Sequence, residues 1–214
     1  MRYSGPIHGL IKFLDRTYLD DFLSGSLYMN TLQYFAEQET SDPSAEVRGD
    51  SWEGMARALG ITSMKVRIDS VYIPIAGIDH QLPWCQSGGI RANVFCMYAL
   101  AENWTPPVDE ENFKFGDIFA CITNVGEFFR RLKAAEKTCE YRLLCDLVEY
   151  FPQTYQGEVG IFKKRSQFQY QSELRIAVDP GPGQPYRLEI GDLSDIVVTG
   201  ALREINECLR WPAQ

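Results

Sequence analysis

Residues 168–178, FQYQSELRIAV, place amide, carboxylate and guanidinium groups at alternate positions. The aromatic and β-branched residues and the alternation predict a β-strand. Side chains two positions apart share one face of a strand, so one face is expected to carry Gln169, Gln171, Glu173 and Arg175. A fixed carboxylate can stabilise positive charge that develops in a transition state, and a nearby cation keeps the carboxylate ionised. We therefore take this stretch as the candidate active strand of a cleft, with Glu173 as its central group.

The N-terminal region predicts a short strand followed by a helix. Residues 10–13 form an apolar run that contains one cation, Lys12. Asp15 is a suitable N-cap, apolar residues then recur at helical spacing, and Gly25 stands where a left-handed C-terminal residue is favoured. The helix is therefore expected to end at Gly25.

A second strand is expected at residues 26–32, SLYMNTL, which alternate apolar and polar side chains. Tyr28 and Asn30 fall on its polar face. A short helix is expected at residues 32–39, and a loop rich in Ser, Asp, Pro and Gly at residues 39–54. In this loop Arg48, Asp50 and Glu53 either form a turn held by local ion pairs or line the cleft.

The remaining elements include a continuously apolar run at residues 94–100 and a second segment at residues 117–123 whose centre is apolar, and both predict buried strands. Asn124 and Glu127 form the pattern of a capping box at the start of a helix. A second amphipathic helix is expected over residues 143–151, because Pro152 would end it. Further strands are expected within residues 64–75, 158–164, 186–190 and 195–199, a loop at 79–93 and a turn at 181–184.

The order of these elements indicates the fold class. Strands cluster towards both ends of the chain and helices lie between them, which is typical of an α+β fold with split, mostly antiparallel sheets and flanking helices. The length of 214 residues fits a single domain over residues 1–214, with room for an insertion at about 54–107.

Composition and motifs exclude several classes of function. A net charge of −8 argues against a surface that as a whole attracts duplex nucleic acid, although residues 163–165, KKR, could meet a phosphate. The six cysteines contain no CxxC pair, and only two histidines, His8 and His80, are present, so the common zinc patterns are excluded and no metal is expected. No Gly-x-Gly-x-x-Gly or Walker A motif occurs. No signal peptide or 18-residue apolar run occurs either, so we expect a cytoplasmic protein that does not contact a membrane.

The triplet Gln171-Ser172-Glu173 resembles the Gln-x-Glu motif of ADP-ribosyltransferases. Residues 170–176, YQSELRI, are also similar to a pattern in a widespread bacterial domain thought to share that fold. The N-terminal plan of strand, helix ending in Gly, and strand resembles the DNA-modifying toxin branch, in which the first strand reads Tyr-His-Phe. Here residues 11–13 read Ile-Lys-Phe, so Lys12 replaces the usual His or Arg.

The resemblance implies an ADP-ribosyltransferase-like fold that uses NAD as substrate, in a bacterial or phage toxin or defence context. In this family a carboxylate beside the ribose stabilises an oxocarbenium-like state as nicotinamide leaves, and Glu173 would take that role. Gln171 would orient the acceptor. The residues implied on the NAD side are Lys12, Tyr28, Asn30 and Tyr34, and those on the acceptor side are Lys163, Lys164, Gln169 and Arg175. The acceptor is either protein or nucleic acid.

Other interpretations stay open at this point. The polar residues of 168–178 also fit an ordinary solvated strand face, Lys12 an edge-strand lysine, and Tyr28 and Tyr34 core or rim aromatics. The scaffold could also serve as a non-enzymatic interaction module that has lost NAD binding, which the substitution at Lys12 favours. Only Arg175 and the basic run at 163–165 support an RNA- or DNA-binding domain. Basic runs of this kind are usually just solvated.

Overall fold

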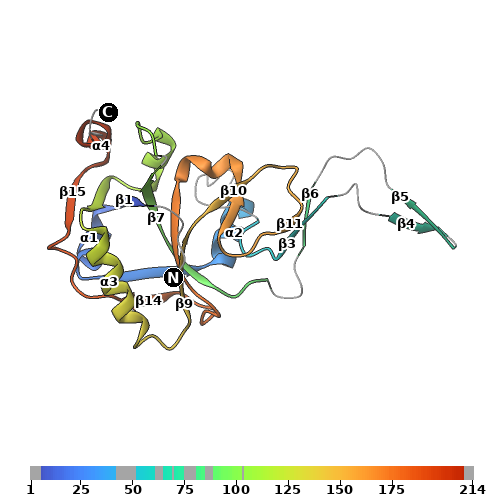
Figure 1. The fold of residues 1–214 in the computed structure, drawn as a ribbon, viewed down its shortest axis with the longest axis horizontal. Coiled ribbons are helices and arrows are strands. Elements are labelled where there is room, and N and C mark those ends of the chain that lie inside the picture. Colours follow the sequence, from blue (N-terminus) through green and yellow to red (C-terminus); the bar gives the residue numbers. More distant parts are fainter. Residues whose placement is uncertain are drawn as a thin grey trace.

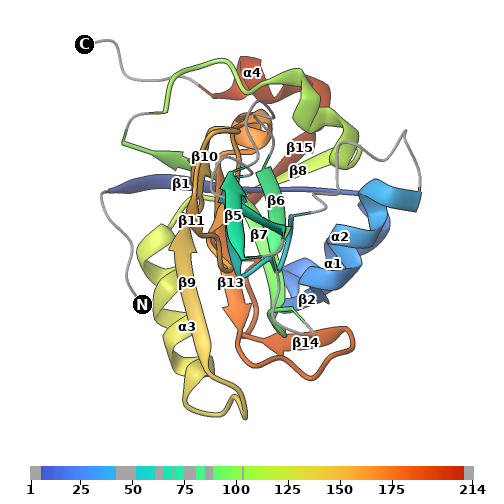
Figure 2. The ribbon, with the colours of Figure 1, turned by 90° about the vertical axis from the view of Figure 1, so that its right-hand side faces the viewer.

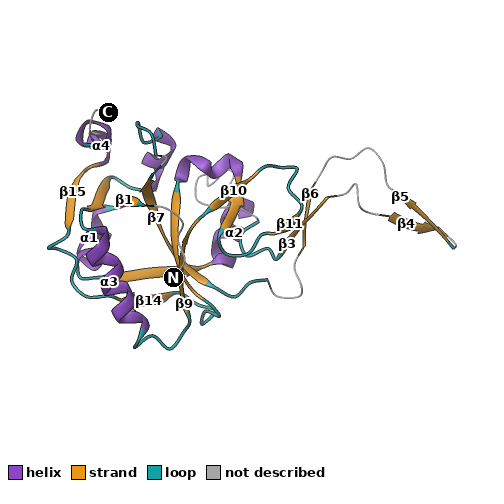
Figure 3. Cartoon of the chain, viewed as in Figure 1, coloured by secondary structure: helices purple, strands orange, loops and turns teal. Residues whose placement is uncertain are grey.

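The computed structural model describes residues 6–41, 52–60, 65–68, 70–74, 81–84, 89–102 and 104–209. An eight-stranded sheet forms its body, with the order β14-β2-β7-β1-β8-β15, and β13 and β9 extend from β7 (Figures 1 and 3). These strands are β1 (Ile7–Leu14), β2 (Ser26–Thr31), β7 (Asn93–Ala101), β8 (Ile118–Ile122), β9 (Leu143–Leu147), β13 (Glu173–Val178), β14 (Tyr186–Glu189) and β15 (Val197–Ala201). All their pairings are antiparallel.

The sheet splits along one edge of β7. On one side β7 pairs with β13 from Asn93 to Tyr98. On the other side β2 pairs only with Asn93 and Val94, and β1 pairs from Tyr98 onward. The strands β1 and β2 therefore diverge from the same edge of β7 between Val94 and Tyr98. This arrangement agrees with the predicted α+β class and its split, mostly antiparallel sheet.

The helices are short, and the longest of them, α3 (Val125–Glu136), covers one face of the sheet. Phe128 and Leu132 of α3 are fully buried in the main apolar cluster, together with Leu10 of β1 and Phe95 of β7. The other helices are α1 (Leu19–Leu23), α2 (Leu32–Ser41), α4 (Ile205–Cys208) and the 3-10 helices η1 (Arg16–Tyr18), η4 (Glu110–Phe115), η5 (Ser166–Gln171) and η6 (Leu202–Glu204). In the part of the chain that the structure describes, no helix has the length and apolar character needed to span a membrane.

A second group of short strands lies beside and beyond this body. β3 (Arg57–Gly60) pairs with β6 (Gln81–Trp84) and with β11 (Gly157–Glu158), and β4 (Lys65–Ile68) pairs with β5 (Val71–Pro74). The hairpin of β4 and β5 projects away from the main sheet (Figure 1), and Figure 2 views the molecule along that projection. Because the central strand β7 also lies within residues 54–107, only the part before β7 stands apart from the main sheet.

Three sequence predictions of secondary structure are wrong. The single strand expected at 158–164 is divided, because only residues 157–158 (β11) and 163–165 (β12) form strands. The expected strand 168–178 begins only at Glu173, because residues 166–171 form η5 and Ser172 adopts a left-handed conformation with φ of 40°. Gln169 and Gln171 therefore do not share a strand face with Glu173. The expected helix 143–151 is instead β9 followed by β10 (Glu149–Phe151), which pairs in parallel with β12 (Lys163–Arg165). A short leucine-rich run is compatible with a helix or with a strand, and residues 143–147 form a strand because they pair with β13.

Smaller differences concern the ends of elements. The single helix expected before Gly25 is divided into η1 and α1, and the Asp15 side chain makes no capping hydrogen bond. Residues 81–84, expected in a loop, form β6, and the expected last strand begins at Val197 instead of residue 195. The strands expected at 26–32, 94–100, 117–123 and 186–190 are confirmed within one or two residues.

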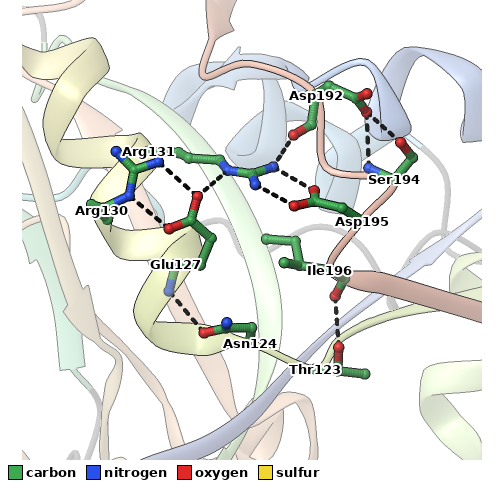
Figure 4. A network of polar contacts seen from close by, with 9 residues as sticks. All are labelled: Thr123, Asn124, Glu127, Arg130, Arg131, Asp192, Ser194, Asp195 and Ile196. Carbon is green, nitrogen blue, oxygen red and sulfur yellow. Dashed lines mark hydrogen bonds and ion pairs between the residues drawn. The ribbon is translucent and has the colours of Figure 1, made fainter.

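The start of α3 forms a polar network that joins this helix to the chain before β15 (Figure 4). Asn124 Oδ1 accepts a hydrogen bond from the Glu127 N–H at 3.0 Å, which confirms the predicted N-cap. The Glu127 carboxylate binds Arg130 and Arg131 at 2.6 and 2.7 Å. Arg131 in turn pairs with Asp195 at 2.6 Å and donates to the Asp192 carbonyl. The network therefore connects segments that are far apart in the chain.

Glu127 is expected to stabilise the fold in a pH-dependent way. Hydrogen bonds from Arg130 and Arg131 lower the pKa of Glu127 from its ordinary 4.5 to about 2. A carboxylate whose pKa is lower in the native than in the unfolded protein stabilises the fold at pH values above its unfolded pKa. This contribution disappears as the pH falls through the native pKa. The difference in melting temperature between the wild type and Glu127→Gln should therefore be constant near pH 7 and shrink between pH 4.5 and 2. Glu136→Gln, at the exposed other end of α3, is the control. If the difference in melting temperature between the wild type and Glu127→Gln did not change over this pH range, the lowered pKa of Glu127 would be contradicted.

Candidate functional site

A cavity of about 570 Å³ opens where β1 and β2 diverge from β7. The strands β1, β2, β7, β12 and β13 line it, together with η1, η5, α1 and α2. This cavity is lined by every residue that the sequence predicted on the NAD side, which are Lys12, Tyr28, Asn30 and Tyr34. The Gln and the Glu of the Gln-x-Glu motif, Gln171 and Glu173, line it as well. The split in the sheet thus brings the two ends of the chain together at one concave site.

Lys12 lies at the split itself. Its ammonium donates a hydrogen bond to the carbonyl of Cys96 at 2.8 Å and lies 4.4 Å from the centroid of the Phe95 ring. Cys96 is in the part of β7 between the residues that pair with β2 and those that pair with β1. β1 pairs with β7 only as far as Ile11, whereas Lys12 itself pairs with Ala120 of β8, so the side of β1 that faces β7 is open at Lys12. The bond to the Cys96 carbonyl holds the Lys12 ammonium in this opening, so Lys12 is not an ordinary solvated lysine.

Aromatic side chains form the outer part of the cavity. On β2, alternation buries Leu27 and Met29 in the core and leaves Tyr28 49% exposed. Tyr34 of α2 is 42% exposed, so neither tyrosine is a core residue. The guanidinium of Arg187, on β14, lies 5.3 Å from the centroid of the Tyr28 ring and pairs with Asp21 at 2.8 Å. The rim therefore presents two aromatic faces and one cation.

The inner part of the cavity is a buried cluster of four charged side chains. Glu173 and Arg175 come from β13, Lys164 from β12, and Glu53 from the turn before β3, and they are exposed by 7%, 1%, 4% and 6%. Glu173 Oε1 accepts a hydrogen bond from Lys164 Nζ at 2.8 Å, and Glu173 Oε2 accepts one from Arg175 Nε at 2.8 Å. Two carboxylates and two cations leave the cluster with no net charge, as burial requires.

Electrostatics keep the cluster ionised. Burial by itself raises the pKa of Glu173, but Arg175 and Lys164 outweigh burial and hold this pKa below its ordinary value. Burial by itself lowers the pKa of Lys164, while the carboxylates of Glu173 and Glu53 raise it above its ordinary value. Burial, reinforced by the nearby Glu173, raises the pKa of the Cys96 thiol to about 12. Glu173 is therefore an anion at neutral pH, whereas Cys96 is a neutral thiol.

Lys164 also joins Gln171 to Glu173. Its ammonium donates to Gln171 Oε1 at 2.7 Å as well as to Glu173. The left-handed Ser172 between them is held on β7, because its hydroxyl donates to the Ala99 carbonyl at 2.9 Å and its carbonyl accepts from the Ala99 N–H at 2.7 Å. Gln171 and Glu173 thus share one cation, although they do not share a strand face.

The predicted acceptor-side group is divided by the structure. Gln169 is exposed and does not line the cavity, and the ammonium of Lys163 binds the Tyr155 hydroxyl at 2.9 Å, outside the cavity. Lys164 and Arg175 line the cavity but are buried, so neither side chain is presented on the surface, and their role on the acceptor side stays a prediction. The interpretation of 163–165 as a solvated basic run is also wrong at Lys164, because the apolar and charged surroundings of β12 enclose it.

Glu53 lines the cavity, which is one of the two alternatives that the sequence left for it, but the sequence did not reveal its partners. Arg48 and Asp50, which shared those alternatives, lie outside the described residues, as does His80. In the structure Glu53 binds Arg175, 122 positions along the chain. No local pattern signals a contact at that separation.

Comparisons of the chain with protein-family models, with curated proteins and with solved structures find no match.

Proposed function

We propose that the protein transfers ADP-ribose from NAD to a macromolecular acceptor, and that its fold is of the ADP-ribosyltransferase-like type. One observation carries the proposal: the cavity at the sheet split contains the Gln171 and Glu173 pair together with Lys12, Tyr28 and Asn30 from the first two strands. The resemblance in sequence implies that these groups share one site. A bacterial or phage toxin or defence role is part of the same proposal.

The cavity fits a dinucleotide in size and chemistry. A volume of about 570 Å³ lies within the range of small-molecule sites. The exposed rings of Tyr28 and Tyr34 offer faces for the nicotinamide or adenine ring, and Arg187 at the rim offers a cation for a phosphate. NAD supplies the activated bond between nicotinamide and ribose whose cleavage drives the transfer.

Glu173 supplies the negative charge that this cleavage needs. As the nicotinamide bond breaks, positive charge develops on the ribose, and a fixed anion beside it lowers the barrier. An ionised carboxylate has about four acceptor positions, and the hydrogen bonds from Lys164 and Arg175 use two of them. The remaining capacity of Glu173 is suited to a ribose hydroxyl. Gln171, whose amide can both donate and accept, would orient the acceptor.

A second candidate function is a non-enzymatic binding module on the same scaffold. The observation that favours it is that each oxygen of Glu173 already binds a cation in a buried cluster. A buried cluster of this kind can specify the fold without taking part in a reaction.

The test uses purified protein with NAD labelled on its adenosine part, in a bacterial lysate, and follows nicotinamide release and transfer of label. We expect Glu173→Gln to lower nicotinamide release about 100- to 1,000-fold, as the loss of an electrostatic catalytic group does. The control is Glu207→Gln, an exposed glutamate on α4, which should act as the wild type does. Digestion with protease or nuclease then shows whether the labelled acceptor is protein or nucleic acid.

A fold-preserving variant completes the test. Tyr28→Ala changes an exposed side chain, so it should fold normally and raise the KM for NAD. If the wild type releases no nicotinamide and NAD does not raise its melting temperature, the transferase proposal fails and the binding module remains, because a ligand of the native state must stabilise it.

A further inference from the structure

Glu53 holds one end of the Arg175 guanidinium. Arg175 Nη1 donates to Glu53 Oε2 at 2.9 Å, and Nη2 donates to Glu53 Oε1 at 2.5 Å, which is a two-bond fork. Nη1 also donates to the Ile161 carbonyl at 2.7 Å. The turn that carries Glu53 is itself anchored, because Gly54 accepts from the Ile90 N–H at 3.0 Å. The terminal nitrogens of Arg175 are therefore directed away from Glu173.

This fork determines how Arg175 meets Glu173. A guanidinium binds a carboxylate most strongly through two parallel N–H bonds. Two carboxylates compete for the single guanidinium of Arg175, and Glu53 receives the fork while Glu173 receives only the Nε bond at 2.8 Å. Without Glu53, Arg175 would be able to turn its fork towards Glu173 and occupy more of its acceptor positions.

Glu53 also balances the charge of the cluster. Its Oε1 lies 3.4 Å from Lys164 Nζ, in addition to its contact with Arg175. Loss of the Glu53 charge would leave one carboxylate, Glu173, facing two buried cations. Both cations would then be drawn more strongly to Glu173.

We propose that Glu53 is a positioning residue for the transfer reaction. By holding the Nη end of Arg175, Glu53 limits that arginine to one bond with Glu173 and keeps acceptor capacity of the Glu173 carboxylate directed into the cavity for a ribose hydroxyl. The inference rests on the proposed function, since it assigns Glu53 a part in the chemistry of Glu173.

The experiment compares Glu53→Gln, which keeps the shape but removes the charge, with the wild type. We expect kcat for nicotinamide release to fall about 10- to 100-fold, as it does when an orienting partner of a functional group is lost in metal sites. The KM for NAD should change less than about threefold, because Glu53 acts on the reacting state through Arg175. Glu149→Gln is the control, because Glu149 also pairs with a lysine, at 3.6 Å, but its side chain is 77% exposed.

A double variant separates this role from a structural one. Glu53→Gln combined with Arg175→Met removes one charge of each sign, so the cluster stays neutral, and it also removes the guanidinium that would crowd Glu173. We expect its kcat to exceed that of Glu53→Gln alone. The double variant also provides the test if the single variant does not fold, and in that case an inactive double variant would overturn the inference.

A crystal structure of Glu53→Gln provides a readout that does not depend on turnover. We expect Arg175 to bind Glu173 through two nitrogens in this variant. The inference is overturned if Arg175 keeps its single Nε bond, if kcat of Glu53→Gln stays within about threefold of an active wild type, or if the double variant is no faster than the single one. An inactive wild type would instead overturn the proposed function, and with it the role of Glu53 in transfer.

Discussion

Replacing Lys164 with Met is expected to lower the free energy of unfolding by about 3–5 kcal/mol, the usual cost of removing one partner from a buried ion pair. Lys164 is only 4% exposed, and its ammonium binds Glu173 at 2.8 Å and Gln171 at 2.7 Å. Methionine has a similar length but no charge. The variant would leave two buried carboxylates, Glu53 and Glu173, with Arg175 as their shared cation.

The adjacent lysine is the matched control for this prediction. Lys163 has a 28% exposed side chain and pairs with the exposed Glu149 at 3.6 Å. Because exposed ion pairs contribute little, Lys163→Met should cost less than about 1 kcal/mol. Urea unfolding of both variants at pH 7 measures the difference. Equal losses for the two lysines would show that the cluster around Glu173 is not buried as the structure has it.

Gly25→Ala is expected to destabilise the protein by about 2–5 kcal/mol, which combines the cost of a left-handed alanine with that of overpacking. Gly25 follows α1 and has φ of 84°. A Cβ atom there would lie 1.9 Å from the carbonyl oxygen of Gly191, which is backbone and cannot rotate away. The Gly25 carbonyl also accepts a hydrogen bond from the Ile190 N–H at 3.0 Å, so the clash would disturb the chain next to β2 and β14.

Gly160→Ala separates the two parts of that cost. Gly160 also has a positive φ, 73°, but a Cβ atom there meets nothing within 4 Å. Its replacement should therefore cost only about 1–2 kcal/mol, the conformational part. Thermal and urea unfolding give both values. If Gly25→Ala lowered the free energy of unfolding no more than Gly160→Ala does, residues 25 and 191 would not lie as close together as the structure has them.

Several features of the fold follow from local sequence alone. The apolar residues at 94–100 and 118–122 predicted β7 and β8, because a strand covered on both faces needs apolar residues at every position. Asn124 predicted the start of α3, since an N-cap acts within one turn of its helix. Alternation in β2 predicted that Tyr28 would face away from the core. Each of these signals acts over a few residues, so the sequence displays it directly.

The candidate active strand, residues 168–178, shows where a prediction from local pattern fails. Alternation predicted a strand through Gln169 and Gln171, but the bonds of Ser172 to Ala99 of β7 bend the chain and leave these residues in η5. For residues 143–151, pairing of β9 with β13 outweighs the helical spacing of the leucines. Both outcomes depend on strands that are distant in the chain, and no pattern within a short window contains that information.

By itself, the sequence determined the α+β class, the strands β2, β7, β8 and β14, the helix α3, and the residue types of the Gln171 and Glu173 pair. Only the tertiary structure decided that Lys164 is buried and that Glu53 completes the cluster around Glu173. The physical reason is that burial and charge pairing depend on which segments pack together, whereas propensity depends on neighbours along the chain. The basic run predicts a solvated Lys164, but Glu53 from a turn far along the chain and Glu173 from the nearby strand β13 lie 3.4 and 2.8 Å from its ammonium and neutralise it.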